Sequence, residues 1–157
     1  MKTVATRFAP SPTGPLHIGG VRTALFNWLY SKNKGGKFYL RIEDTDKERS
    51  KDKFKNQIIN SLKWIGINYE DSEYIQSKKI DDHINVANEL LKKGLAYKCY
   101  CSSDEIEEQK KRAKQKKIPY IYDRKWRDKS ESDAPKEIDP VIRFKSKVEG
   151  KSILKDL

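Results

Sequence analysis

The chain has 157 residues, which is enough for one domain, or a domain and part of another, with a buried core. Hydrophobic residues make up 36% of it, and the absence of any run of about 18 apolar residues excludes a membrane-spanning helix. The first six residues predict no cleavable secretory signal, so we expect a cytoplasmic protein. A net charge of +11 favours a polyanionic partner, although a lysine-rich composition can also reflect a biased genome.

The N-terminal part of the chain predicts a βαβ unit. Residues 3–8 alternate as a strand, residues 18–34 repeat apolar side chains at helical spacing, and residues 38–42 alternate as a second strand. Two strands joined by one helix predict a right-handed crossover in a parallel sheet. Two evident parallel strands are fewer than an open α/β sheet normally contains, so the sequence predicts a fragment of a larger sheet.

The later elements are shorter and more mixed. Helical spacing predicts one helix from about Lys51 to Gly66 and another from Ile80 to Gly94. Ser102 and Glu105 form a capping-box signature that opens a further helix. The remaining expectations are an acidic loop over 67–74, a short strand over 96–101, a strand over 141–144 and the beginning of its partner over 152–157.

The loop from Arg7 to Gly20 contains three prolines and three glycines between the first strand and the first helix. A helix that begins there, at the carboxyl end of a parallel strand, directs free amides and a positive dipole end toward the ligand crevice of α/β folds. We therefore predict a phosphate or nucleotide site, with a purely structural role of the histidine and the two glycines as the alternative. His17 would donate to a phosphoryl oxygen, while Gly19 and Gly20 would let a flat base or ribose approach the backbone.

A cation and a carboxylate are expected at the same crevice. Arg7 and Glu43 lie at the carboxyl ends of two strands that the βαβ unit makes neighbours. Such a pair suits an amino acid, because Arg7 would bind a carboxylate and Glu43 an ammonium group. The alternative is that the two side chains pair with each other, and their spacing does not separate these interpretations.

The region after residue 102 is basic and aromatic. A run of cations over 110–117 precedes an alternation of aromatic residues and cations over 120–127. Such runs are often solvated helix faces, but this alternation could also stack on bases and contact phosphates, so both interpretations stay open. The candidate RNA-binding residues are Lys111, Lys114, Arg124, Lys125, Trp126 and Arg127.

Three motifs resemble the N-terminal catalytic half of bacterial-type glutamyl-tRNA synthetase, a class I aminoacyl-tRNA synthetase. They are residues 7–14, the HIGH-like stretch His17-Ile18-Gly19-Gly20 and residues 41–46 (Arg-Ile-Glu-Asp-Thr-Asp), and a weaker similarity extends over essentially the whole chain. The resemblance implies an α/β fold: the class I Rossmann-like nucleotide-binding fold with an incomplete parallel sheet over 1–96. Residues 97–157 would begin an inserted α+β domain that binds the tRNA acceptor stem.

The resemblance also implies an activity and a site. The family activates L-glutamate with ATP and Mg²⁺ and passes the glutamyl group to tRNA(Glu); we expect a monomer. By analogy, Arg7, Ala9, Ser11 and Glu43 would bind glutamate, while Thr13, His17, Gly19 and Gly20 would bind ATP, with His17 as the catalytic residue. Because the family's KMSKS loop and anticodon-binding domain do not occur in these 157 residues, we expect the chain alone to be inactive.

Cys99 and Cys101 are weak zinc candidates. A disulfide across one intervening residue would be strained, which favours a reduced compartment. Some members of the family bind zinc through such a pair plus a later Cys and a Tyr or His, but no Cys or His follows Tyr122 here. A closed zinc site needs four ligands, so we predict no zinc, with Tyr97 and Tyr122 as the remaining donors.

Two other functions stay open. A glutamyl-queuosine tRNA-type synthetase paralogue attaches glutamate to a modified base of tRNA, but its opening motif usually differs around Thr13 to Gly20. A non-catalytic tRNA-binding module would keep the fold and the basic surface without activity. A plain nucleotidylyltransferase shares the His-x-Gly-x pattern, but Arg7, Glu43 and the basic insertion argue against it.

Overall fold

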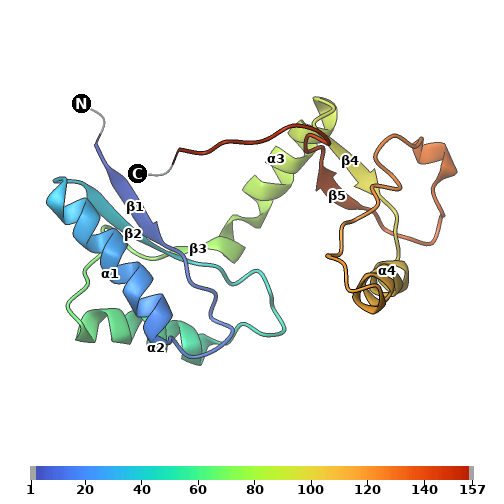
Figure 1. Ribbon diagram of the computed structural model, residues 1–157. Coiled ribbons are helices and arrows are strands. Elements are labelled where there is room, and N and C mark those ends of the chain that lie inside the picture. Colours follow the sequence, from blue (N-terminus) through green and yellow to red (C-terminus); the bar gives the residue numbers. More distant parts are fainter. Residues whose placement is uncertain (1–2, 156–157) are drawn as a thin grey trace. The chain divides into compact units, whose positions relative to one another are not determined.

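A parallel sheet of three strands, in the order β1-β2-β3, organises the N-terminal part of the computed structural model, which describes residues 3–155 (Figure 1). Its strands and helices are β1 (Ala5–Phe8), α1 (Ile18–Asn33), β2 (Lys37–Ile42), α2 (Asp52–Trp64) and β3 (Tyr74–Ile75), followed by the 3-10 turn η1 (Gln76–Lys79). The predicted βαβ unit is confirmed by the parallel pairing of β1 with β2. The sequence did not indicate β3, because two residues are too few to show an alternation.

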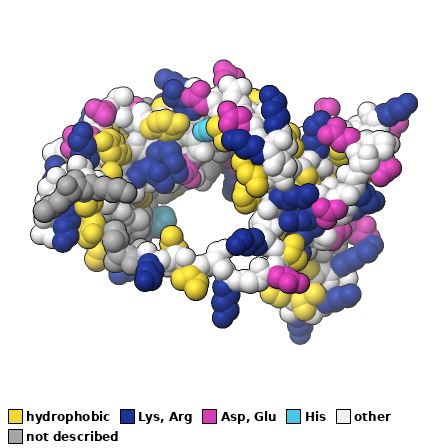
Figure 2. All heavy atoms as spheres, turned by 90° about the horizontal axis from the view of Figure 1, so that it is seen from above, with side chains coloured by type: hydrophobic (Ala, Val, Ile, Leu, Met, Phe, Trp, Pro, Cys, Tyr) yellow, Lys and Arg dark blue, Asp and Glu magenta, His cyan; other side chains and the backbone are white. Residues whose placement is uncertain are grey.

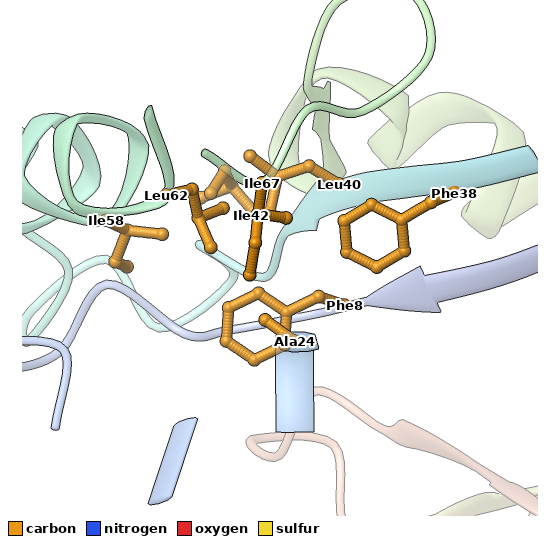
Figure 3. Packing of buried hydrophobic residues seen from close by; sticks show 8 residues of the cluster. All are labelled: Phe8, Ala24, Phe38, Leu40, Ile42, Ile58, Leu62 and Ile67. Carbon is orange, nitrogen blue, oxygen red and sulfur yellow. The ribbon is translucent and has the colours of Figure 1, made fainter. Parts of the chain in front are cut away.

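Alternation along β2 places the core on one face of the sheet. Phe38, Leu40 and Ile42 are almost completely buried, whereas the residues between them are more exposed. Helices α1 and α2 pack against this face, and burying one such large apolar side chain contributes about 1.5–3 kcal/mol. Figure 3 shows the eight residues of this core: Phe8, Ala24, Phe38, Leu40, Ile42, Ile58, Leu62 and Ile67.

The opposite face of the sheet carries polar and charged side chains. Arg7 lies opposite Tyr39 in the register of β1 and β2, and Arg41 lies opposite Tyr74 in the register of β2 and β3. These residues alternate with the buried ones, so they point away from the core. The residues expected to bind ligand therefore begin on the face that α1 and α2 leave open.

A second compact unit begins at Asp81, and the first ends at Ile80. Its elements are α3 (Ile80–Lys92), β4 (Ala96–Cys99), α4 (Ser103–Gln115), the 3-10 turn η2 (Glu131–Asp133) and β5 (Val141–Phe144). The domain boundary expected between residues 96 and 97 stays a prediction. Among the described residues, no helix combines the length and the apolar character needed to cross a bilayer.

Strands β4 and β5 pair antiparallel, with Tyr97 opposite Arg143. The sequence predicted that residues 152–157 begin a partner strand for β5. This prediction is wrong for the described residues 152–155, which form no strand. Residues 156 and 157 lie outside the described part. Strand β5 instead pairs with β4 over all four of its residues. The capping box of Ser102 and Glu105 is confirmed at the start of α4.

Gly36 precedes β2 where two backbone segments approach closely. A Cβ atom at this position would lie 2.3 Å from the carbonyl oxygen of Val4. That oxygen also accepts the Lys37 amide at 2.9 Å, so it cannot move freely. We predict that Gly36→Ala lowers the free energy of unfolding by about 1–3 kcal/mol, as overpacking does.

Urea denaturation followed by circular dichroism measures this loss. Gly14→Ala is the matched control, because a Cβ at Gly14 would meet nothing within 4 Å. Equal stability of the two variants would contradict the close approach at Gly36.

Candidate functional site

The loop between β1 and α1 is fixed to the segment that follows β2. The carbonyl oxygen of Pro10 accepts the amide of Glu43 at 2.9 Å, and that of Pro12 accepts the amide of Lys51 at 3.0 Å. Pro12 is fully buried. Proline donates no backbone hydrogen bond, so its carbonyl is the group through which it can be held. The loop is thus stabilised by contacts from outside it.

His17 is the N-cap of α1. Its Nδ1 atom accepts the amide of Gly19 at 3.1 Å, and its backbone is extended, as an N-cap requires. An Nδ1 atom that accepts is unprotonated, so the neutral ring carries its proton on Nε2. The exposed imidazole therefore keeps an Nε2–H donor for a ligand. Sequence reasoning missed the capping role, which the position of His17 just before the helical repeat could have indicated.

Gly19 and Gly20 were expected to let a base or ribose approach the backbone. They also leave room for the side chains of His17 and Leu16. A Cβ at Gly19 would lie 2.9 Å from the Cε1 atom of His17, and a Cβ at Gly20 would lie 2.8 Å from the Cδ1 atom of Leu16. A larger residue at either position would push the capping ring or Leu16 aside. The first turn of α1, which is described in full, carries no acidic residue that would neutralise its positive end.

Arg7 and Glu43 do not pair with each other. The guanidinium of Arg41 binds the Oε1 atom of Glu43, with Nε at 3.1 Å and with Nη2. Arg7 is exposed and makes no ion pair among the described residues. The structure thus excludes mutual pairing, and it adds Arg41, whose position two residues before Glu43 was the available signal. Roles in binding glutamate for Arg7, Ala9, Ser11 and Glu43 stay predictions.

Asp44 links the ends of β2 and β3, which the sequence did not indicate. Its carboxylate accepts the amide of Ser77 at 2.8 Å and the hydroxyl of Ser77 at 2.6 Å. Partial burial would raise the pKa of Asp44, but the hydrogen bonds from Ser77 outweigh it and hold the pKa below its usual value. A hollow of about 210 Å³ adjoins this link, lined by residues that include Pro12, Asp44 and Ser50.

In the second unit, two thiols converge on one hydroxyl. The Oη atom of Tyr122 lies 3.0 Å from Sγ of Cys99 and 3.3 Å from Sγ of Cys101. Burial and both thiols raise the pKa of Tyr122, which therefore stays protonated. Burial would raise the pKa of Cys99 as well, but hydrogen bonds, foremost that of Tyr122, lower it.

The candidate RNA-binding residues differ in their surroundings. Lys111 and Lys114 are exposed on α4, whereas Lys125 pairs with Glu105 at 2.5 Å. Trp126 is only 6% exposed and packs edge-on against Tyr100 with ring centroids 5.1 Å apart. Figure 2 shows basic side chains interspersed with acidic ones on the face it presents. The backbone amide of Arg127 donates to the carbonyl of Arg124 at 2.8 Å. RNA binding by the six candidate residues stays a prediction.

Known proteins match the chain over nearly its whole length. The family model described as tRNA synthetases class I (E and Q), catalytic domain, matches residues 3–157. Glutamate–tRNA ligase of Pelagibacter ubique is 76% identical over 157 residues, which are 100% of this chain and 34% of that protein. Glutamate–tRNA ligase 1 of Bartonella bacilliformis is 53% identical over 154 residues, which are 98% of this chain and 32% of that protein.

A solved structure agrees with the sequence matches. The crystal structure of a glutamate tRNA ligase from Elizabethkingia meningosepticum in complex with its amino acid gives a TM-score of 0.76 at 33% identity, covering 91% of this chain and 32% of that chain. The parallel sheet, its proline- and glycine-rich loop and the capped helix are therefore part of a class I aminoacyl-tRNA synthetase catalytic domain. The chain belongs to the family of class I tRNA synthetases for glutamate and glutamine.

The predicted Rossmann-like class I fold and the resemblance to bacterial glutamyl-tRNA synthetase are confirmed by these matches. The chain spans about a third of the length of the relatives it matches.

Asp44 provides a prediction about pH. Because its folded pKa is lowered, its contribution to stability is present above its unfolded pKa of about 3.9 and is lost as the pH falls through the folded value. Asp44→Asn should therefore unfold at a lower temperature than the native chain at pH 7, and the difference should shrink below about pH 4.

Thermal unfolding at a series of pH values measures the difference. Asp139→Asn, at an exposed loop position, is the control and should change little. A difference for Asp44→Asn that stays constant down to pH 2 would contradict the role of the ionised carboxylate.

Proposed function

We propose that the protein to which this chain belongs activates L-glutamate with ATP and transfers it to tRNA(Glu). One observation carries the proposal: His17 caps α1 through Nδ1, so its Nε2–H donor and the positive end of α1 both lie at the carboxyl edge of the sheet. Arg7 and Glu43 come from the ends of β1 and β2 at that same edge. The 76% identity to a glutamate–tRNA ligase supports the same activity.

The nucleotide end of the site would stabilise phosphate charge. A carboxylate oxygen of glutamate attacks the α-phosphorus of ATP, the bond to the bridging oxygen of the β-phosphate breaks, and pyrophosphate leaves. His17 donates its Nε2 proton in a hydrogen bond to a phosphate oxygen, and the amide end of α1 adds partial positive charge. Thr13, Gly19 and Gly20 lie along the nucleotide. No side chain needs to act as a nucleophile, so positioning and electrostatics supply the catalysis.

Mg²⁺ would enter as part of the ATP substrate. Among the described residues, no three side chains of the types His, Cys, Asp and Glu form a group that could hold a metal ion. In this proposal the phosphates of ATP are its main ligands.

The amino-acid end would select glutamate by charge. Arg7 binds the side-chain carboxylate through its fork of donors, and Ala9 and Ser11 line the pocket. Both hydrogen bonds from Arg41 to Glu43 go to Oε1, which leaves Oε2 to accept the α-ammonium group. Arg41 is thus a positioning residue that orients the carboxylate toward its ligand.

The transfer step would use tRNA(Glu). A ribose hydroxyl of the terminal adenosine attacks the glutamyl carbonyl carbon, the mixed anhydride bond breaks, and AMP leaves. The cations Lys111, Lys114, Arg124, Lys125 and Arg127 contact phosphates of the acceptor stem, and Trp126 supports them by packing on Tyr100. The phosphate contacts weaken with salt and carry little sequence information. We place the reaction in the cytoplasm, with the protein as a monomer.

The first test replaces the corresponding residues of the Pelagibacter ubique ligase by this chain, which matches it along its whole length. We expect the chimera to catalyse pyrophosphate exchange into ATP with glutamate and tRNA present, and Arg7→Ala to lower kcat/KM for glutamate by about 100-fold, a loss of about 2.7 kcal/mol. The isolated chain should show no exchange. A folded chimera that binds tRNA without exchange would favour a non-catalytic tRNA-binding module instead.

A second test separates the two roles of His17. In the same chimera, His17→Asn keeps a capping side chain but lacks the Nε2–H donor, whereas His17→Ala lacks both. We expect His17→Asn to keep the native unfolding temperature while kcat falls about 100-fold, as on loss of one transition-state donor. His17→Ala should lose both. Full activity of His17→Asn would limit His17 to capping.

A further inference from the structure

The thiol pair of the second unit faces a cation that belongs to the protein. Arg143 lies opposite Tyr97 in the β4–β5 ladder, on the face that also carries Cys99. The central carbon of its guanidinium lies 4.0 Å from the ring centroid of Tyr122, and the nearby Cys99 raises the pKa of Arg143. Cys99 is 1% exposed, so this contact is shielded from water.

The residues around the thiols do not fit the zinc ion that a Cys-x-Cys pair suggests in this family. Among the described residues, Cys99 and Cys101 find no third Cys, His, Asp or Glu with which to form a metal-binding group. The hydroxyl of Tyr122 lies within hydrogen-bond distance of both sulfurs. In addition, the guanidinium that packs on Tyr122 carries a fixed positive charge on the face of Cys99, and this charge repels a divalent cation there.

We propose that Arg143 takes the place of a metal ion in this cluster. Its fixed charge lies on the face that carries Cys99, and its planar face packs on Tyr122, which itself binds both thiols. The cluster thereby holds the segment around Tyr122 against the antiparallel pair of β4 and β5 without a metal. This inference is independent of the proposed function, because it concerns how the second unit is held together.

The charge of Arg143 is tested by metal affinity. Cadmium is the probe, followed by the ultraviolet absorption of cadmium–thiolate bonds in the complete chain. We expect weak binding to the native chain and binding about tenfold tighter or more to Arg143→Gln, which removes the repelling charge. Arg143→Lys keeps the charge and should bind cadmium as weakly as the native chain. A merely structural role for Arg143 would not make affinity follow charge in this way.

The planar contact is tested by stability. Arg143→Gln and Arg143→Lys both lose the forked, stacked guanidinium, so each should lower the unfolding midpoint by about 4–8 °C, the shift expected for about 1 kcal/mol in a small domain. Arg112→Gln is the matched control. It removes an equal charge from an exposed ion pair with Glu108 on α4 and should change the midpoint little.

Chelation of the native chain decides the proposal even where a variant does not fold. The chain, produced with zinc in the medium, should contain no stoichiometric zinc, and EDTA should leave its unfolding midpoint unchanged. One zinc ion per chain with a midpoint lowered by EDTA would overturn the proposal. Cadmium affinity of a folded Arg143→Gln equal to that of the native chain would also overturn it.

Discussion

Two backbone hydrogen bonds hold together the part of the molecule on which the site depends. The carbonyls of Pro10 and Pro12 accept the amides of Glu43 and Lys51, so the loop after β1 is fixed to the segment after β2. Each such bond contributes only about 1 kcal/mol, but it joins segments that carry different ligand groups. Arg7, His17 and Glu43 consequently keep fixed positions along one edge of the sheet, as the proposed catalysis by positioning would require.

At that edge, each proposed ligand-binding side chain uses one polar atom to bind a neighbouring protein group and keeps another polar atom for the ligand. The Nδ1 atom of His17 caps α1 while Nε2–H remains, and Oε1 of Glu43 binds Arg41 while Oε2 remains. The second unit follows a related principle, since the guanidinium of Arg143 packs on the ring of Tyr122. In both units, neighbouring protein groups fix the orientation of the side chain. At the proposed ligand site this would reduce the reorganisation needed when the ligand binds.

The sequence predicted the elements whose signal is local. The helical repeat before Gly35, the alternation of β2 and the capping box of Ser102 depend on neighbouring residues, and all three are present. Contacts between distant residues were not predictable in the same way. The link from Asp44 to Ser77 and the contact of Arg143 with Tyr122 exist only after the chain has folded, and β3 is too short to show a period.

The central claim is that the loop from Arg7 to Gly20 has an amino-acid end and a nucleotide end. Amide resonances of the isotope-labelled chain, titrated with a non-hydrolysable glutamyl-adenylate analogue, test it most directly. We predict shifts at Arg7 and Glu43 that adenosine alone does not cause, and shifts at Gly19 and Gly20 that adenosine shares. A folded chain whose resonances shift elsewhere, or not at all at saturating analogue, would contradict this account.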